Sequence, residues 1–332
     1  MINMERTKIQ DEHKSPPNPS TFRWFLGLLV ASTFSMVYFV APFYMLTVVF
    51  ALVFKYPSVE IAWMYAIPMI VSAILPPMAS PLALRLISPL IDYFDYEEIH
   101  ETSPVDVQKE ILSNNKNYLL VFQPHGALSF TGITSMVTAP QAMKGKLPTA
   151  VADALLYTPI LKHVLGIFGL ISASKSSMIR TLKKKGVEGT IVLYVGGIAE
   201  LFLTDETDER LYLRKRKGFI KLALQQGVDV VPVYLFGNTN ALSVLKTGFL
   251  AAISRKLQIS LTYIWGKWYL PIPRDCKLLY ASGQPLGMPH ILDPSQADID
   301  KWHEKYCSEV MRIFEKYKEK VPEYKHKKLE II

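Results

Sequence analysis

Two long stretches without a charged residue dominate the first third of the chain. The first runs from Trp24 to Phe54, which is 31 residues, and the second from Ile61 to Leu84, which is 24 residues. Each is longer than the roughly 20 apolar residues with which a helix crosses a bilayer. The link at 55–60 is short, so the two stretches predict a membrane hairpin that keeps both of its ends on one side.

The second stretch contains four prolines, Pro68, Pro76, Pro77 and Pro81. Because proline removes a backbone donor, they predict a kink, a break or a re-entrant path. One alternative for the first stretch is a cleaved signal peptide, but the apolar core of such a peptide is usually only about 7–15 residues long. Another is a hairpin buried in a water-soluble protein, which would need a much larger protein around it. Membrane anchoring is favoured over both.

Charges at the ends of the hairpin predict its orientation. Arg23 and Arg85 flank it on the side of the remaining chain, which places that side in the cytosol, although Lys55 opposes this assignment. The chain then divides into a polar tail at 1–21, a two-segment membrane hairpin at 22–85 and a cytosol-facing domain at 86–332.

The domain after the hairpin shows short apolar runs that end in turns. These runs are 118–122 before Pro124, 190–195 before Gly196, 228–236 before Gly237, and 277–281 before Gly283. Helical stretches lie between several of them, and apolar residues at three- and four-residue spacing predict a helix from Asp298 to about Lys320. The alternation predicts an α/β domain with helices around a central sheet, in which mixed strand directions are allowed.

Charge and cysteine content narrow the classes of partner. The 37 Lys and Arg against 29 Asp and Glu give a net charge of +8, which suits anionic lipid, a phosphate-bearing ligand or nucleic acid. No nucleic-acid recognition motif accompanies the charge, so nucleic acid is disfavoured. Cys276 and Cys307 are too few for a disulfide framework and lack metal-ligand spacing, so we expect no metal site.

The first candidate for chemistry is His125, in Gln123-Pro124-His125-Gly126 directly after a predicted buried strand. A loop at the carboxyl end of a strand can present a ring to a crevice, and Gly126 allows a substrate to approach the backbone closely. Histidine is suited to act as a general base near neutral pH. The alternative is a turn histidine with a purely structural role.

The second candidate is the turn Gly196-Gly197-Ile198-Ala199-Glu200, which follows another predicted strand. Glu200 could orient His125 or contact the acceptor. The alternative is a carboxylate that merely stabilises the start of a helix through its dipole.

The third candidate is a run of cations before a predicted helix. It comprises Arg214, Lys215, Arg216, Lys217 and Lys221. Such a run suits a ligand that carries phosphate groups. A solvated or lipid-facing charge run is the alternative.

Taken together, these elements resemble the type 2 diacylglycerol acyltransferase family. The resemblance rests on Pro124-His125-Gly126, the Gly-Gly pair followed by Glu200, and the block from Arg216 through Val231-Pro232-Val233 to Phe236-Gly237, in the family's order and at roughly its spacing. It extends from about Phe22 to Lys318 and includes the turn Ser282-Gly283-Gln284-Pro285-Leu286.

The resemblance implies acyl transfer from acyl-CoA to the hydroxyl of a neutral glycerolipid, typically diacylglycerol, in the endoplasmic reticulum membrane and at lipid droplets. It also implies that His125 is the catalytic base and that acyl-CoA, a substrate rather than a cofactor, meets the basic run. Backbone N–H groups around Gly126 are candidates for an oxyanion hole, with Gly196 and Gly197 in the neighbouring turn. Direct transfer needs no metal, cofactor or covalent intermediate, and a homo-oligomer is left open.

Several positions depart from the family pattern. Glycerolipid acyltransferases more broadly place an Asp five residues after the histidine, where this chain has Phe130, so Glu200 is the substitute we expect. Gln123 stands where animal members often have His, and Asn238 stands where an acidic residue is common. The acceptor therefore stays open between diacylglycerol, monoacylglycerol and a long-chain alcohol that would give wax esters. A non-catalytic lipid-binding protein is a more distant alternative.

Overall fold

A seven-stranded mixed sheet forms the centre of the computed structural model, which describes residues 14–16, 19–113, 116–203, 207–247 and 262–332. The strand order is β1-β10-β7-β2-β5-β3-β4. Strands β7, β2, β5, β3 and β4 are parallel, whereas β10 runs antiparallel to β7 and β1 runs parallel to β10. The predicted α/β class with a central mixed sheet is confirmed.

Four of the seven sheet strands coincide with apolar runs predicted from the sequence, whereas β1, β3 and β4 were not predicted. The seven strands are β1 (Asp95–His100), β2 (Tyr118–Gln123), β3 (Thr149–Val151), β4 (Leu170–Ser172), β5 (Ile191–Tyr194), β7 (Asp229–Phe236) and β10 (Lys277–Ser282). Two small sheets pair β6 (Glu209–Leu211) with β11 (Leu329–Ile331), and β8 (Ser243–Val244) with β9 (Ile264–Trp265). The four predicted strands correspond to β2, β5, β7 and β10.

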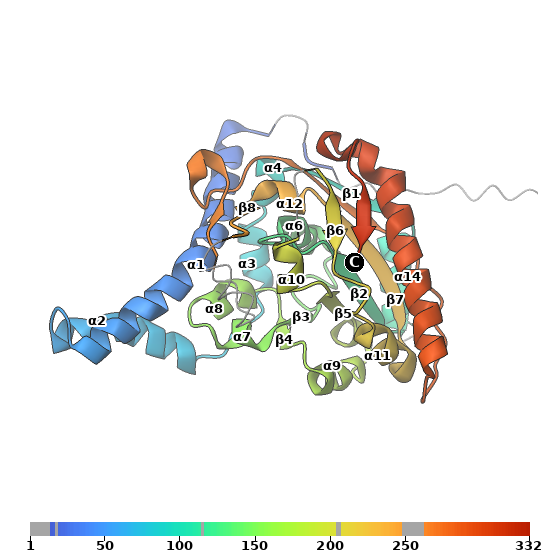
Figure 1. Ribbon diagram of the computed structural model, residues 1–332, viewed down its shortest axis with the longest axis horizontal. Helices are drawn as coiled ribbons and strands as arrows, with labels where there is room; N and C mark the ends of the chain where they lie inside the picture. Colours follow the sequence, from blue (N-terminus) through green and yellow to red (C-terminus); the bar gives the residue numbers. More distant parts are fainter. Residues whose placement is uncertain (1–13, 17–18, 114–115, 204–206, 248–261) are drawn as a thin grey trace, which may run out of the picture.

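Helices cover both faces of the sheet (Figure 1). The longer ones are α1 (Thr21–Phe54), α2 (Val59–Ile74), α5 (Pro104–Ser113), α6 (Phe130–Thr138), α9 (Lys175–Leu182), α11 (Gly218–Gln226) and α14 (Gln296–Tyr317). The short ones are α3 (Pro81–Leu86), α4 (Leu90–Tyr93), α7 (Asp153–Tyr157), α8 (Leu161–Gly166), α10 (Ile198–Leu201) and α12 (Asn238–Ala241). The helix predicted near the C-terminus is confirmed as α14, which begins with a capping box of Ser295 and Asp298.

Alternation along β2 divides the core into two layers. Leu119 and Val121 pack with α11 and α14 on one face, whereas Tyr118 and Phe122 pack with α6 and the first part of α1 on the other. Because every residue of β7 is buried, both faces of this strand are covered. A central strand with two covered faces is typical of parallel sheets.

The two halves of α1 have different surroundings. In the first half, Arg23 pairs with Asp92 at 2.8 Å, and Phe34 is buried with its ring centroid 6.0 Å from that of Phe168. In the second half, Val53 and Phe54 are each 66% exposed. The helix therefore begins as part of the globular core and continues beyond it.

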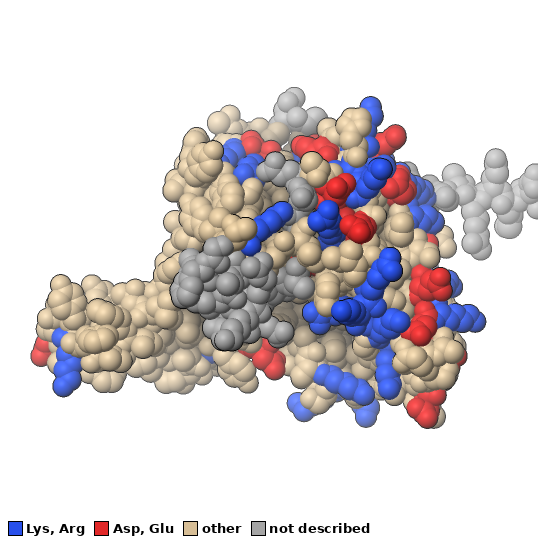
Figure 2. All heavy atoms as spheres, viewed as in Figure 1, with Lys and Arg blue, Asp and Glu red and all other residues tan. Residues whose placement is uncertain are grey.

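The exposed part of α1 and the following α2 form an arm that projects from the globular body (Figure 1). The Tyr44 hydroxyl donates to the Tyr65 carbonyl at 2.5 Å, which ties the two helices together. Figure 2 shows the arm almost free of charge, except at its end, where the turn carries Lys55 and Glu60. Of the helices in the described ranges, α1 alone is long and apolar enough to cross a membrane, because α2 has only 16 residues.

The prolines of the second apolar stretch lie both within a helix and in the segment where the helix is interrupted. Pro68 lies inside α2, while the helix ends at Ile74 and the chain is non-helical until α3 begins at Pro81. The expected break is thus confirmed, at residues 75–80. The membrane hairpin and the division of the chain at residues 21 and 85 stay predictions.

Candidate active site

His125 lies in the loop that joins β2 to α6, at the carboxyl end of a central parallel strand. Its Nδ1 is 2.8 Å from the carbonyl oxygen of Gly126. Because a carbonyl oxygen only accepts, we assign the proton to Nδ1, which leaves the lone pair on Nε2. Burial lowers the pKa of His125, and the bond to Gly126 opposes this only in part. The ring is therefore neutral near pH 7 and has a nitrogen that can accept a proton.

Asn238, which is fully buried after β7, holds this loop in place. Its amide nitrogen donates to the carbonyl of Pro124 at 2.9 Å, to that of His125 at 3.3 Å and to the hydroxyl of Ser129 at 2.9 Å. Its oxygen accepts from the backbone N–H of Thr131 at 2.9 Å, in the first turn of α6. One side chain thus joins the end of β7 to the loop and to the helix that follows it.

Gly126 adopts the left-handed conformation with φ of 65°. A Cβ at this position would lie 2.9 Å from the Asn238 carbonyl oxygen, so the close approach of the two loops also requires glycine. The structure therefore gives Gly126 a conformational role beside His125.

Glu200 lies beneath the loop and contacts the backbone of His125. Its Oε2 accepts from the His125 N–H at 3.2 Å, so the hydrogen bond between the two residues goes to the main chain and not to the ring. Burial raises the pKa of Glu200 to about 8, although bonds from the backbone of His125 and Tyr212 and the charge of Arg216 lower it. The carboxyl is therefore mostly protonated and uncharged at neutral pH. It holds the backbone of His125 in place and does not stabilise a positive charge on the ring.

The glycine pair of the same turn makes room for this carboxyl. A Cβ on Gly196 would lie 1.7 Å from the Glu200 carboxyl carbon, so any side chain there would displace this carboxyl. Gly197 has φ of 60° and ψ of −152°, a conformation that is essentially restricted to glycine. Gly196 and Gly197, both singled out in the sequence, thus give the turn the conformation and the space that the Glu200 carboxyl needs beneath the His125 loop.

Tyr194, at the end of β5, packs against His125 with 5.0 Å between the ring centroids. A Cβ on Gly132 of α6 would lie 2.0 Å from the Tyr194 hydroxyl oxygen, so the helix accommodates this hydroxyl through a glycine. Burial raises the pKa of Tyr194 far above its ordinary value, so the hydroxyl stays protonated and can donate. Tyr194 is not among the residues identified from the sequence, and Asn238 stands out there only as a departure from the family pattern. Tyr194 lies within a predicted apolar run, and Asn238 follows another one.

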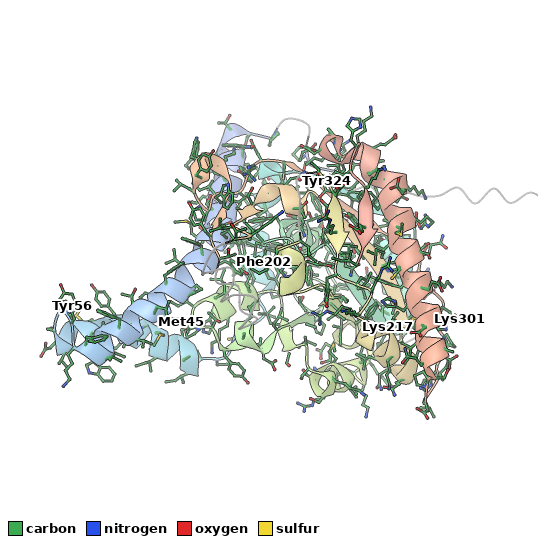
Figure 3. All side chains as sticks on the ribbon, viewed as in Figure 1. Met45, Tyr56, Phe202, Lys217, Lys301 and Tyr324 are labelled. Atoms are coloured by element: carbon green, nitrogen blue, oxygen red, sulfur yellow. The ribbon has the colours of Figure 1, made fainter. Side chains whose placement is uncertain are left out.

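A cavity of about 790 Å³ extends from His125 towards the arm formed by α1 and α2. On one side α1 contributes Tyr38, Met45 and Val49, and Figure 3 labels Met45 on this part of the helix. On the other side lie His125 and Tyr194, between apolar side chains of α6, α8 and the neighbouring strands. The cavity has the size and the mainly apolar lining of a small-ligand site.

The basic run is only partly brought to this cavity. Arg216 lines it, with the guanidinium 5.2 Å from the Tyr212 ring centroid. Lys217, which Figure 3 labels, pairs with Asp300 of α14 at 2.7 Å. Arg214 donates to the carbonyl of Ile331 at 2.8 Å. Lys215 and Lys221 of the same run are exposed. Figure 2 shows basic side chains gathered over the part of the molecule where Figure 1 places α11.

Comparison with known proteins identifies the family to which the chain belongs. The diacylglycerol acyltransferase family matches residues 90–332, which is more than half of the chain. The chain belongs to this family. The match contains His125, Glu200 and the basic run, whereas α1 and α2 precede it.

Three relatives show how far the similarity extends. Diacylglycerol O-acyltransferase 2 of Xenopus tropicalis is 26% identical over 248 residues, which cover 68% of this chain and 68% of the relative. Acyl-CoA wax alcohol acyltransferase 2 of Mus musculus is 28% identical over 233 residues, 64% of this chain and 69% of the relative. The human 2-acylglycerol O-acyltransferase 3 is 28% identical over 244 residues, 68% of this chain and 71% of the relative. All three names describe acyltransferases, but each gives a different acceptor.

Proposed function

We propose that this acyltransferase moves a fatty acyl group from acyl-CoA to the hydroxyl of diacylglycerol and so makes triacylglycerol. The observation that carries the proposal is the position of His125 on the wall of an apolar cavity that α1 also borders. A neutral lipid with long chains stays in the bilayer, so its acyltransferase must present the reacting groups next to the membrane. A cavity between an apolar helix and a catalytic loop fulfils this requirement.

In the proposed reaction, Nε2 of His125 takes the proton of the acceptor hydroxyl as its oxygen attacks the thioester carbonyl carbon. The C–S bond then breaks, and the proton passes from the imidazolium to the departing CoA thiolate. Backbone N–H groups around Gly126 are the proposed donors to the oxyanion. The acyl group goes directly to the acceptor, so the proposal includes no covalent intermediate, cofactor or metal.

The proposed roles of the neighbouring residues follow from their positions. Arg216 on the cavity wall offers a positive charge to the phosphates of acyl-CoA. Glu200 and Asn238 hold the His125 loop through hydrogen bonds to its backbone. They are positioning residues in this proposal, because neither is assigned a bond to the reacting groups.

Monoacylglycerol or a long-chain alcohol is the second candidate acceptor. The names of the mouse and human relatives include a wax alcohol and a 2-acylglycerol, so both acceptor classes occur among similar chains. We place diacylglycerol first because the family takes its description from it. A lipid-binding protein without activity is the distant alternative, which the presence of His125 in the cavity opposes.

We also propose that α1 and α2 anchor the enzyme in the endoplasmic reticulum membrane, with the catalytic domain in the cytosol and with lipid droplets as a second location. Support comes from the exposed apolar surface of the arm, which carries charge only at the turn with Lys55 and Glu60. Arg23 at the start of α1 and Arg85 in α3 lie on the body side of the arm, as the positive-inside tendency requires.

Ester synthesis from radiolabelled acyl-CoA in microsomes tests the function. We expect triacylglycerol to be the main product when diacylglycerol, monoacylglycerol and hexadecanol compete at equal concentration. His125→Ala should lower the rate by about 10²–10⁴-fold at equal protein abundance. His326→Ala, which changes an exposed histidine, is the matched control and should keep the full rate. No ester from any of the three acceptors would contradict the proposed activity.

A further inference from the structure

A second cavity, of about 560 Å³, lies on the same face of the sheet as the first. Met136 of α6 borders both cavities, and the second extends between α5, α6 and the ends of β1 and β10. Its wall carries Glu98, His100 and Ser282, none of which takes part in the proposed acyl transfer.

These three side chains form a continuous chain of hydrogen bonds. The Ser282 Oγ is 3.0 Å from Nδ1 of His100, and Nε2 of the same ring is 2.9 Å from Oε2 of Glu98. The parallel pairing of β1 with β10 places His100 opposite Ser282, and Glu98 precedes His100 by two residues and so shares its face of the sheet. The arrangement thus follows directly from strand register.

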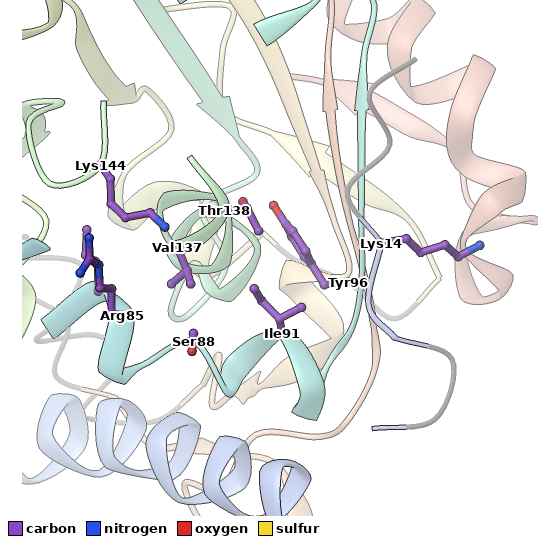
Figure 4. Close-up of a pocket in the computed structure, with 9 residues that line it drawn as sticks. Lys14, Arg85, Ser88, Ile91, Tyr96, Val137, Thr138 and Lys144 are labelled. Atoms are coloured by element: carbon purple, nitrogen blue, oxygen red, sulfur yellow. The ribbon is translucent and has the colours of Figure 1, made fainter. Parts of the chain in front are cut away.

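Glu98 is held as a carboxylate in spite of its burial. Its Oε1 accepts from the Tyr96 hydroxyl at 2.7 Å and from the Thr138 hydroxyl. Burial alone would raise the pKa of Glu98, but the hydrogen bonds from His100, Thr138 and Tyr96 hold it below its ordinary value. Figure 4 shows Tyr96 and Thr138 with their hydroxyls close together on the wall of a smaller adjoining cavity of about 320 Å³.

The carboxylate determines which ring nitrogen of His100 carries the proton. Because ionised Glu98 only accepts, Nε2 is the donor, and Nδ1 is left to accept from the Ser282 hydroxyl. A serine that donates to an imidazole whose other nitrogen is held by a carboxylate is the arrangement of an activated nucleophile. Buried hydrogen bonding for stability alone would not require all three groups to face one cavity.

The cavity lining indicates the class of substrate. Apolar side chains such as Leu120, Phe122 and Met143 form much of the wall, and among the described residues that line it none is Lys or Arg. A polyanion such as acyl-CoA finds no compensating charge there, in contrast to the Arg216 side of the first cavity. The exposed Val105 on the rim connects the cavity with the surface.

We propose that this second cavity is an esterase site, in which Ser282 is the nucleophile that cleaves uncharged long-chain carboxylic esters. The Ser282 oxygen attacks the ester carbonyl carbon while its proton moves to Nδ1 of His100. The ester C–O bond then breaks, and His100 returns the proton to the departing alcohol. Water, deprotonated by His100, attacks the acyl-serine ester, and the fatty acid leaves as Ser282 regains its proton.

Covalent labelling of the full-length protein in detergent tests this site. An alkyl fluorophosphonate with a long apolar chain reacts with activated serines, and peptide mass spectrometry locates the adduct. We expect an adduct on Ser282 that a long-chain neutral ester suppresses by competition. This experiment needs only the unmodified chain, so it decides the question even where a variant fails to fold. Absence of an adduct on Ser282 would overturn the proposal.

Variants separate the two cavities. Ser282→Ala should abolish both the adduct and fatty-acid release from the neutral ester, and His100→Ala should lower both by at least about 100-fold. Ser135→Ala is the matched control, because this serine lines the same cavity but donates to the Gly132 carbonyl at 2.8 Å. His125→Ala should keep the adduct even though it loses acyl transfer, so failure of one proposal does not imply failure of the other. Unchanged ester cleavage in Ser282→Ala would contradict the assignment.

Discussion

Two histidines on one face of the same sheet have opposite surroundings. Nδ1 of His125 is bonded to a backbone carbonyl, and no carboxylate of the described residues contacts its Nε2. His100 has a carboxylate on Nε2 and a serine on Nδ1. Ring contacts connect the two through Tyr194, Phe122 and Tyr280, with centroid separations between 5.0 and 5.6 Å. Two histidines in one continuous core thus have hydrogen-bond partners that suit two different reactions.

The difference shows how the partners of an imidazole limit its chemistry. A base that acts on a bound lipid hydroxyl must keep one nitrogen open to the cavity, as His125 does. A base that activates a serine of its own chain has both nitrogens occupied by protein groups, as His100 does. The charged residues around the two histidines also differ. The cationic Arg216 lines the cavity of His125, whereas the anionic Glu98 lines the cavity of His100.

The largest expected effect comes from Asn238→Ala, which disturbs the His125 loop and leaves the His100 cluster intact. The change removes hydrogen bonds to Pro124, Ser129 and Thr131 at a fully buried position. We expect a loss of about 2–4 kcal/mol in the free energy of unfolding, measured by urea denaturation. Acyl transfer should fall more than labelling of Ser282.

A suitable control for this change is Asn240→Ala. Asn240 is less buried, and its side-chain oxygen contacts Lys327 only at 3.5 Å. Equal destabilisation by the two variants would show that Asn238 does not hold the loop as described.

The next effect concerns Glu200→Gln, which imitates the protonated carboxyl. Folding raises the pKa of Glu200 from 4.5 to about 8, so the folded state binds the carboxyl proton more tightly than the unfolded state. The resulting stabilisation of the folded state is complete below about pH 4.5 and is lost as the pH rises to about 8. The variant should therefore be more stable than the wild type by about 1–3 kcal/mol at pH 8 and equal to it at pH 4. Urea denaturation at both pH values measures this. A variant that is less stable at pH 8 would show that the ionised form is the one the fold requires.

A smaller effect is expected for Arg216→Gln, which removes the positive charge from the wall of the first cavity. We expect the KM for acyl-CoA to rise roughly 3–10-fold with little change in kcat, because the lost interaction is with the phosphates and not with the reacting carbon. Lys217→Gln should change KM less, since Lys217 is already paired with Asp300. Equal increases for both variants would indicate general surface attraction instead of a site at Arg216.

The smallest effect is a shift in pH dependence. Because burial lowers the pKa of His125, its ring should stay neutral and active as a base below pH 6.5. The acid limb of kcat/KM for acyl transfer should therefore have a midpoint below 6.5, measured between pH 5 and 8. A midpoint above 6.5 would contradict the described environment of the ring.

Sequence patterns predicted the elements that local rules control. Apolar runs that end in turns with proline or glycine identified β2, β5, β7 and β10, and helical spacing identified α14. The positions of His125 and Glu200 at neighbouring strand ends followed from the same rules, since parallel strands bring their carboxyl ends to one edge of the sheet.

The remaining features depend on contacts between distant segments. Asn238 meets the His125 loop across more than 100 residues of chain, and no periodic pattern indicates such a bond. The pairing of Lys217 with Asp300 likewise joins residues that lie far apart in the sequence, and no local pattern indicates it. His100 and Ser282 meet only because β1 pairs with β10, a register that neither strand shows by itself. Side-chain partners of this kind require the folded structure.

The most direct test of the central claim is a cryo-electron microscopy structure of the full chain with a non-cleavable thioether analogue of acyl-CoA. We predict that the acyl chain lies in the cavity between α1 and α6. The carbon that replaces the thioester carbonyl should lie about 3–4 Å from the position of an acceptor hydroxyl oxygen that is hydrogen-bonded to Nε2 of His125. The CoA phosphates should lie on the Arg216 side. An acyl chain in the cavity of Glu98, His100 and Ser282, with the first cavity empty, would contradict the assignment of His125 to acyl transfer.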